Sequence, residues 1–131
     1  MSPTTTLPPQ GSHFISLQEA IEITSLYRAE HENILGSAYK NQQILPICET
    51  FNRYDIDVLL EKEGCAGLRI YFCMDPSLKV KVLVVAVNEK GEDMLPEDAA
   101  RTTDDDGDGD IVQEAHRCPT VCPPASPLNQ P

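Results

Sequence analysis

The feature that most constrains the fold is a run of six apolar residues, Val82-Leu-Val-Val-Ala-Val87. A short run rich in valine predicts a β-strand. Side chains of a strand alternate between its two faces, so a strand that is apolar on both faces is usually covered on both. The chain must therefore supply other elements on each side of this strand.

A second strand is predicted at residues 68–73, where apolar side chains occupy alternate positions. Residues 74–78, with the sequence Met-Asp-Pro-Ser-Leu, have turn chemistry, and the return strand then covers residues 79–87. These segments predict an antiparallel β-hairpin.

A lone two-stranded hairpin is only marginally stable in water, so something must complete this sheet. We expect the completing strand to come from residues 44–47, from residues 111–115, or from the same edge of a second copy of the chain. The last alternative predicts a homodimer, which is a common solution for a core segment of about 80 residues.

Two helices are predicted ahead of the hairpin. Ser16 and Glu19 form a capping box, and an amphipathic pattern follows them as far as Gly36. Asn52 is a good N-cap for a second, short helix that ends before Gly64. The predicted fold class is thus α+β: an amphipathic helix, a short second helix and an antiparallel hairpin of two to three strands, with disordered N- and C-terminal tails.

Proline and charge set the predicted boundaries. Eight of the eleven prolines lie near the two ends of the chain, and eight carboxylates against one arginine lie between residues 97 and 114. We predict a flexible N-terminal tail at residues 1–13, a small α+β domain at residues 14–96, and an acidic linker with a Pro/Cys-rich tail at residues 97–131.

The net charge argues against some classes of partner, and the lack of a targeting pattern indicates where the protein is located. The net charge of −11 disfavours nucleic acid and anionic membrane surfaces. The chain starts without a signal-peptide pattern, and no apolar run is long enough to span a membrane. These features predict a cytoplasmic protein. Since thiols are kept reduced there, and the five cysteines are an odd number, we expect no structural disulfide.

The strongest chemical motif lies near the C-terminus, where Cys118 and Cys122 follow His116. Two thiolates and an imidazole are three of the four ligands of a tetrahedral zinc site, and Cys48 or Cys65 is the candidate for the fourth. The C-x3-C spacing differs from the usual C-x2-C, and the alternative is a solvated tail with free thiols.

Other chemistry is less well supported. Residues 104–110 match part of a calcium loop, but the twelfth position of that loop is Ala115 where a bidentate Glu is needed. No phosphate-binding loop or nucleophile–base pair is present, and we predict that the protein is not an enzyme and carries no cofactor other than this candidate zinc.

Two segments are candidate binding surfaces for a protein partner. Arg69 and Tyr71 share one strand face, where they either bind a partner or an anion, or form hydrogen bonds within the fold. Pro124 and Pro127 have the P-x-x-P spacing of peptides that dock as extended helices. A minor alternative is that the C-terminal segment, with its Cys, Thr and Ser, is the substrate end of a modified-peptide precursor.

Three stretches resemble a group of short uncharacterised bacterial proteins: Leu45-Pro-Ile-Cys-Glu-Thr-Phe51, Gly67-Leu-Arg-Ile-Tyr-Phe-Cys-Met-Asp75 and Arg117-Cys-Pro-Thr-Val-Cys-Pro-Pro-Ala-Ser-Pro-Leu-Asn129. In the pattern of that group Gly is more usual at position 73, so Cys73 departs from it. The resemblance implies no activity and no catalytic residue. The sequence as a whole predicts a non-enzymatic cytosolic protein–protein interaction module with a tethered tail, with a zinc-binding protein as the alternative.

Overall fold

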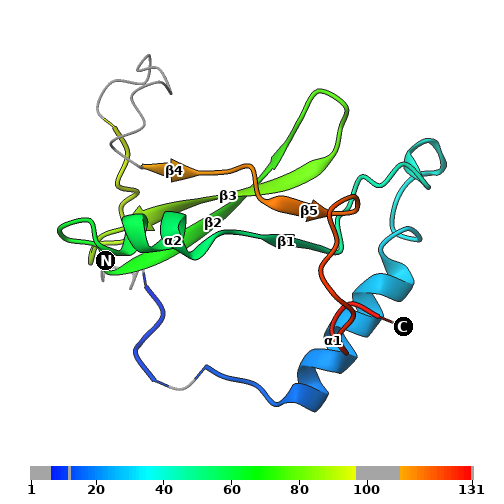
Figure 1. Cartoon of the computed structure of the whole chain (residues 1–131), viewed down its shortest axis with the longest axis horizontal. Helices are drawn as coiled ribbons and strands as arrows, with labels where there is room; N and C mark the ends of the chain where they lie inside the picture. The colour runs from blue at the N-terminus through cyan, green and yellow to red at the C-terminus, as the bar shows by residue number, and fades with distance from the viewer. Residues whose placement is uncertain (1–6, 12, 97–109, 131) are drawn as a thin grey trace, which may run out of the picture. The chain divides into compact units, whose positions relative to one another are not determined.

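The computed structural model describes residues 7–11, 13–96 and 110–130. They form an α+β fold with a three-stranded sheet of order β2-β3-β4 and a two-stranded ladder of β1 with β5 (Figure 1). The elements in chain order are α1 (Leu17–Glu30), a 3-10 turn (Ser37–Tyr39), β1 (Cys48–Thr50), α2 (Arg53–Leu60), β2 (Gly67–Met74), β3 (Val80–Val87), β4 (Ile111–Val112) and β5 (His116–Cys118). Both predicted helices and the predicted hairpin are confirmed.

The chain divides into two compact units, which are described separately. The first unit comprises the described residues of Met1–Gln10, Phe51–Phe72 and Val82–Ala115. The second unit comprises those of Gly11–Thr50, Cys73–Lys81 and His116–Pro131. The β2–β3 hairpin contributes to both units.

In the first unit, β4 is the strand that completes the sheet. It pairs antiparallel with β3, with Val112 opposite Val84 and Ile111 opposite Val85. This confirms residues 111–115 as one source of the third strand, whereas residues 44–47 form no strand of this sheet. The four residues from Val84 to Val87 are all buried, as a strand that is apolar on both faces requires.

The core of the first unit lies between α2 and this sheet. Asn52 caps α2 by accepting a hydrogen bond from the Tyr54 amide at 2.8 Å, and the helix delivers Leu59 to a fully buried position. An ion pair between Lys62 and Asp110 links the end of α2 to the residue just before β4. The buried cluster consists of Leu59, Val84, Ala86 and Val112, with Phe51, Cys65 and Met94 packed against it.

In the second unit, α1 begins where the sequence predicts. The hydroxyl oxygen of Ser16 accepts a hydrogen bond from the Glu19 amide at 3.0 Å, as in a capping box. The helix ends at Glu30, however, and not at Gly36. The Tyr27 hydroxyl donates to the carbonyl oxygen of Pro46 at 2.6 Å, and its ring stacks on that of His31, which caps the C-terminus of the helix.

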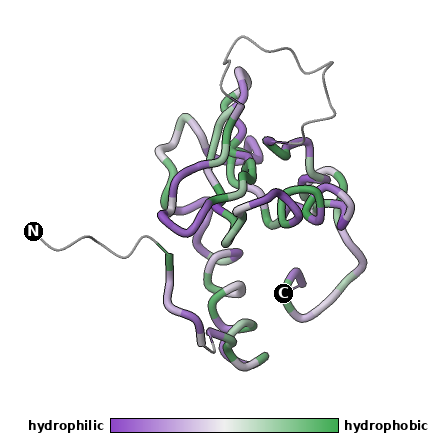
Figure 2. The backbone as a smooth tube through the Cα atoms, turned by 90° about the vertical axis from the view of Figure 1, so that its left-hand side faces the viewer, coloured by the Kyte–Doolittle hydropathy of each residue, from purple (hydrophilic) through white to green (hydrophobic). Residues whose placement is uncertain are grey.

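Many apolar side chains of α1 face solvent. No residue of this helix is buried, and Leu17, Ile23 and Leu26 are 62%, 59% and 63% exposed. Hydrophobic and hydrophilic residues are interspersed along its turns (Figure 2). None of the helices in the described ranges has the length and apolar character needed to cross a membrane.

The β2–β3 turn gives a pH-dependent prediction. One oxygen of the Asp75 carboxylate accepts from the Ser77 amide, the Ser77 hydroxyl and the Lys79 amide at 2.8–3.1 Å. These bonds, the one from the Lys79 amide most of all, lower the pKa of Asp75 from 3.8 to about 2. The stabilisation from this carboxylate is therefore fully present above pH 4 and is lost as the pH falls toward 2.

We expect Asp75→Ala to lower the urea midpoint of unfolding at pH 7, with the difference from wild type shrinking between about pH 4 and pH 2. Asp75→Asn, which keeps an acceptor oxygen but not the charge, should retain part of the stability. An Asp75→Ala deficit that did not change with pH over this range would contradict the assignment.

Candidate functional site

The β1–β5 ladder of the second unit brings together residues that are far apart in the sequence. Strands β1 and β5 run side by side in Figure 1. Cys48 lies opposite Cys118, Glu49 opposite Arg117, and Thr50 opposite His116. Directly opposite side chains point to the same face of a ladder. Cys48 and Cys118 therefore share one face, and Glu49 shares the other face with Arg117.

Cys118 is joined to Cys122 by a disulfide, with the two Cα atoms 4.5 Å apart. The expectation that the chain has no structural disulfide is therefore wrong. That expectation used the odd cysteine count and the compartment, but the C-x3-C spacing lets the chain turn back within four residues. The Val121 amide donates to the Arg117 carbonyl oxygen at 2.9 Å and closes this turn. Cys48, Cys65 and Cys73 are not disulfide-bonded.

Of the four candidate zinc ligands, the structure gathers three cysteines. Cys48 and Cys118 share a ladder face, and Cys122 is bonded to Cys118. His116, two residues before Cys118, lies on the same face with an exposed side chain. In the described part of the chain no group of three or more His, Cys, Asp or Glu is placed to hold a metal ion. Sulfur atoms in a disulfide are not thiolate ligands, so zinc binding remains a prediction for the reduced chain.

The Cys48 thiol is half-buried, and the carboxylate of the next residue, Glu49, lies on the other face of the ladder. Burial raises its pKa, and the negative charge of Glu49 raises it further. Cys48 is therefore mainly protonated at neutral pH, and its reactivity as a nucleophile increases as the pH rises.

Arg117 holds this site together. Its guanidinium group donates at 2.7–3.2 Å to four main-chain carbonyl oxygens of the second unit. The acceptors are Ile44, Gln43, Val80 and Pro119. Arg117 Nε also lies 3.9 Å from Glu49 Oε2, and the two side chains are only 10% and 7% exposed. Glu49 Oε2 is buried and accepts no hydrogen bond from the described residues. The charge of Glu49 is thus balanced inside the unit by Arg117.

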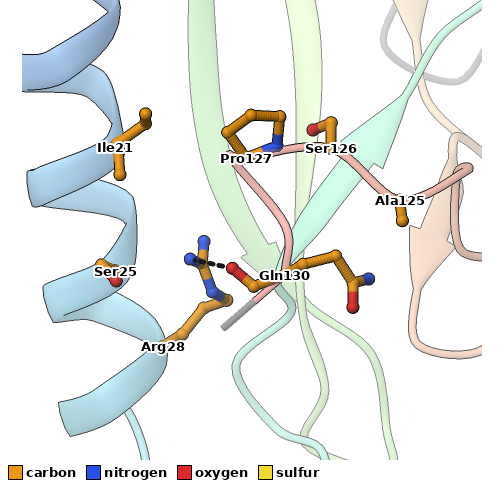
Figure 3. A pocket seen from close by; sticks show the side chains of 7 residues that line it. All are labelled: Ile21, Ser25, Arg28, Ala125, Ser126, Pro127 and Gln130. Atoms are coloured by element: carbon orange, nitrogen blue, oxygen red, sulfur yellow. Dashed lines mark hydrogen bonds between the residues drawn. The ribbon is translucent and has the colours of Figure 1, made fainter.

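A shallow groove of about 420 Å³ separates α1 from the C-terminal segment of the second unit (Figure 3). Arg28 projects from α1 across this groove and donates to the carbonyl oxygens of Leu128 and, at 2.7 Å, Gln130. Of the candidate docking prolines, Pro127 lines the groove, and the Pro124 carbonyl oxygen accepts from the Asn129 side chain at 3.1 Å. Hydrogen bonds between Ser126 and Asn129 make this segment a turn and not an extended helix.

The other two candidate partner-binding residues converge on one carboxylate in the first unit. Arg69 donates to Asp93 Oδ1 at 2.5 Å and to the Gly91 carbonyl oxygen at 2.9 Å, and the Tyr71 hydroxyl donates to Asp93 Oδ2. The bond from Tyr71 and the adjacent Arg69 hold the pKa of Asp93 below its usual value. Both side chains therefore form hydrogen bonds within the fold, and their binding of a partner or an anion stays a prediction.

Sequence reasoning missed Arg117, Arg28 and Asp93. Most acceptors of the two arginines are main-chain carbonyl oxygens, which carry no side-chain signature in the sequence. The candidate calcium loop falls largely outside the described residues, and the last residue of its acidic run, Asp110, forms an ion pair with Lys62.

Comparison of the chain with protein families, with curated proteins and with solved structures finds no match.

We expect Arg117→Ala to lower the free energy of unfolding by about 3–5 kcal/mol, because it leaves a buried carboxylate without its counter-charge. Arg53→Ala is the matched control. Arg53 makes an exposed ion pair with Asp57 at 3.0 Å on α2, and its loss should cost less than about 0.5 kcal/mol. Equilibrium unfolding in urea measures both.

Adding Glu49→Gln to Arg117→Ala should recover part of the lost stability, since the unpaired buried charge is removed. An Arg117→Ala variant as stable as Arg53→Ala, or a double variant less stable than Arg117→Ala alone, would refute the role given to Arg117.

Proposed function

We propose that the protein is a non-enzymatic protein–protein interaction module that binds through strand β2, and that its partner is a second copy of the chain. The observation that carries this proposal is an exposed apolar stripe on an edge strand. β2 is the outermost strand of the order β2-β3-β4. On one of its faces Leu68, Ile70 and Phe72 are 38%, 58% and 78% exposed.

An edge strand offers unpaired main-chain donors and acceptors to another strand. Natural proteins usually protect such an edge with charge, proline or a bulge, yet the sequence of β2, Gly-Leu-Arg-Ile-Tyr-Phe-Cys-Met, contains one charged residue and no proline. Strand addition at an exposed edge is an established mode of recognition. These properties favour an extended strand as the bound partner.

The pattern of β2 is self-complementary in the antiparallel direction. A two-fold axis at Ile70 places Leu68 opposite Phe72 of the second copy on one face, and Arg69 opposite Tyr71 of the second copy on the other. The first pairing joins apolar side chains. In the second, Arg69 and Tyr71 are each already hydrogen-bonded to Asp93 of their own copy, so neither is left unsatisfied in the interface. No two like charges face each other in this register, which matters for a chain with a net charge of −11.

The C-terminal prolines contribute less to this proposal than the sequence implies. Pro127 lines the groove beside α1, and Arg28 binds the carbonyl oxygens that follow it, so the segment is engaged within its own unit. No feature of the described residues favours the zinc-binding alternative or the modified-peptide alternative over strand pairing.

We expect Ile70→Glu to weaken self-association at least tenfold, since burying an unpaired charge in the interface costs more than about 1.4 kcal/mol. Sedimentation velocity over a dilution series gives the dissociation constant. Ile34→Glu is the matched control, because Ile34 is 72% exposed and lies outside β2.

Circular dichroism of both variants reports whether the monomer stays folded, which the 58% exposure of Ile70 allows. A wild-type chain that is monomeric at every concentration would overturn the proposal. Equal weakening by Ile34→Glu and Ile70→Glu would show that the interface lies elsewhere.

A further inference from the structure

We propose that Cys48, Cys118 and Cys122 form a thiol–disulfide exchange centre in which Cys48 takes over the bond to Cys118 and releases Cys122. The inference rests on the geometry of the second unit and not on the proposed interaction through β2. It assigns a covalent switch to the segment that links β5 to the C-terminal turn.

The first step of the argument is proximity. Cys48 and Cys118 are direct partners in the β1–β5 ladder, and the Ile47 amide donates to the Cys118 carbonyl oxygen at 2.7 Å, which fixes the two strands beside this pair. Opposite Cα atoms in an antiparallel pair lie about 4.5–5.5 Å apart. That separation falls within the range of about 4.4–6.8 Å that a disulfide spans. A bond from Cys48 to Cys118 therefore fits the ladder as it stands.

The second step compares Cys48 with the two other cysteines that are not disulfide-bonded. Cys65 belongs to the first unit, where its thiol donates to the Gly67 carbonyl oxygen at 3.4 Å. Cys73 lies on β2, which pairs with β3. Of the three cysteines outside the disulfide, Cys48 is the one paired in register with a cysteine of that disulfide.

The third step is the chemistry of the exchange. The Cys48 thiol loses its proton to solvent, and the resulting thiolate attacks Cys118 Sγ. The Cys118–Cys122 bond breaks, Cys122 leaves with the electron pair, and its thiolate is then free to take up a proton. One disulfide and one thiol are present before and after the step, so no oxidant or reductant is consumed.

The exchange places a thiol on the surface, at Cys122. Cys118 is buried, at 6% exposure, whereas Cys122 is an exposed residue. The product therefore carries a disulfide across β1 and β5 and an exposed thiol at Cys122. Such a thiol is accessible to small disulfides such as oxidised glutathione.

The test uses the full-length Cys122→Ser variant, equilibrated under native conditions with reduced and oxidised glutathione at about 1 mM. Peptide mapping by mass spectrometry then identifies the disulfides. We expect the internal Cys48–Cys118 disulfide to exceed the mixed disulfide of Cys118 with glutathione by at least about tenfold, because the internal thiol acts at a high effective concentration. Cys65→Ser in the same background is the matched control and should give the same ratio.

Cys118 found as a free thiol or as its glutathione mixed disulfide, with Cys48 still a free thiol, would overturn the proposal.

A second measurement, on the wild-type chain, keeps the test valid if the variant misfolds. The reduced protein is reoxidised with oxidised glutathione, and both the Cys48–Cys118 and the Cys118–Cys122 linkages are expected. Detection of the Cys118–Cys122 linkage alone throughout reoxidation would refute the exchange.

Discussion

The guanidinium group of Arg117 is the interaction on which the second unit depends. It reaches the loop before β1, the start of β3 and the turn after β5, and it balances the buried charge of Glu49. Main-chain carbonyl groups that meet in a small unit need donors, and a planar group with five donors can serve several at once. The pairing of β1 with β5, and hence the position of the disulfide, follows from this arrangement.

The parts of the fold that could be predicted are those with local causes. The caps at Ser16 and Asn52 and the hairpin around Asp75 each depend on residues within a few positions of one another. The valine-rich run of β3 also predicted that both of its faces would be covered, and β4 was among the expected sources of the third strand. In each case a capping or turn side chain, or an apolar run, is visible in the sequence and predicts the local structure.

The parts that could not be predicted depend on distant segments. The β1–β5 ladder joins two three-residue strands, each too short to show a period. The acceptors of Arg117 and Arg28 are mostly carbonyl oxygens, which every residue carries. The end of α1 at Glu30 instead of Gly36 depends on tertiary contacts of its last turns, such as the bond from Tyr27 to Pro46.

The two proposals place different chemistry in different units. Residues 68–72 of β2, which belong to the first unit, offer apolar side chains and main-chain groups to another strand, whereas the second unit holds three cysteines around one ladder. Each proposal rests on what the described residues leave exposed or reactive: an apolar stripe on β2, and a thiol opposite a disulfide.

The central claim is that residues 116–122 are an integral part of a folded unit. Amide hydrogen exchange of the intact chain, read by mass spectrometry, tests it most directly. The account predicts that peptides covering β5 and the disulfide turn exchange far more slowly than an unstructured peptide, with protection approaching that of β3. Exchange of this segment at the rate of an unfolded chain would contradict the account.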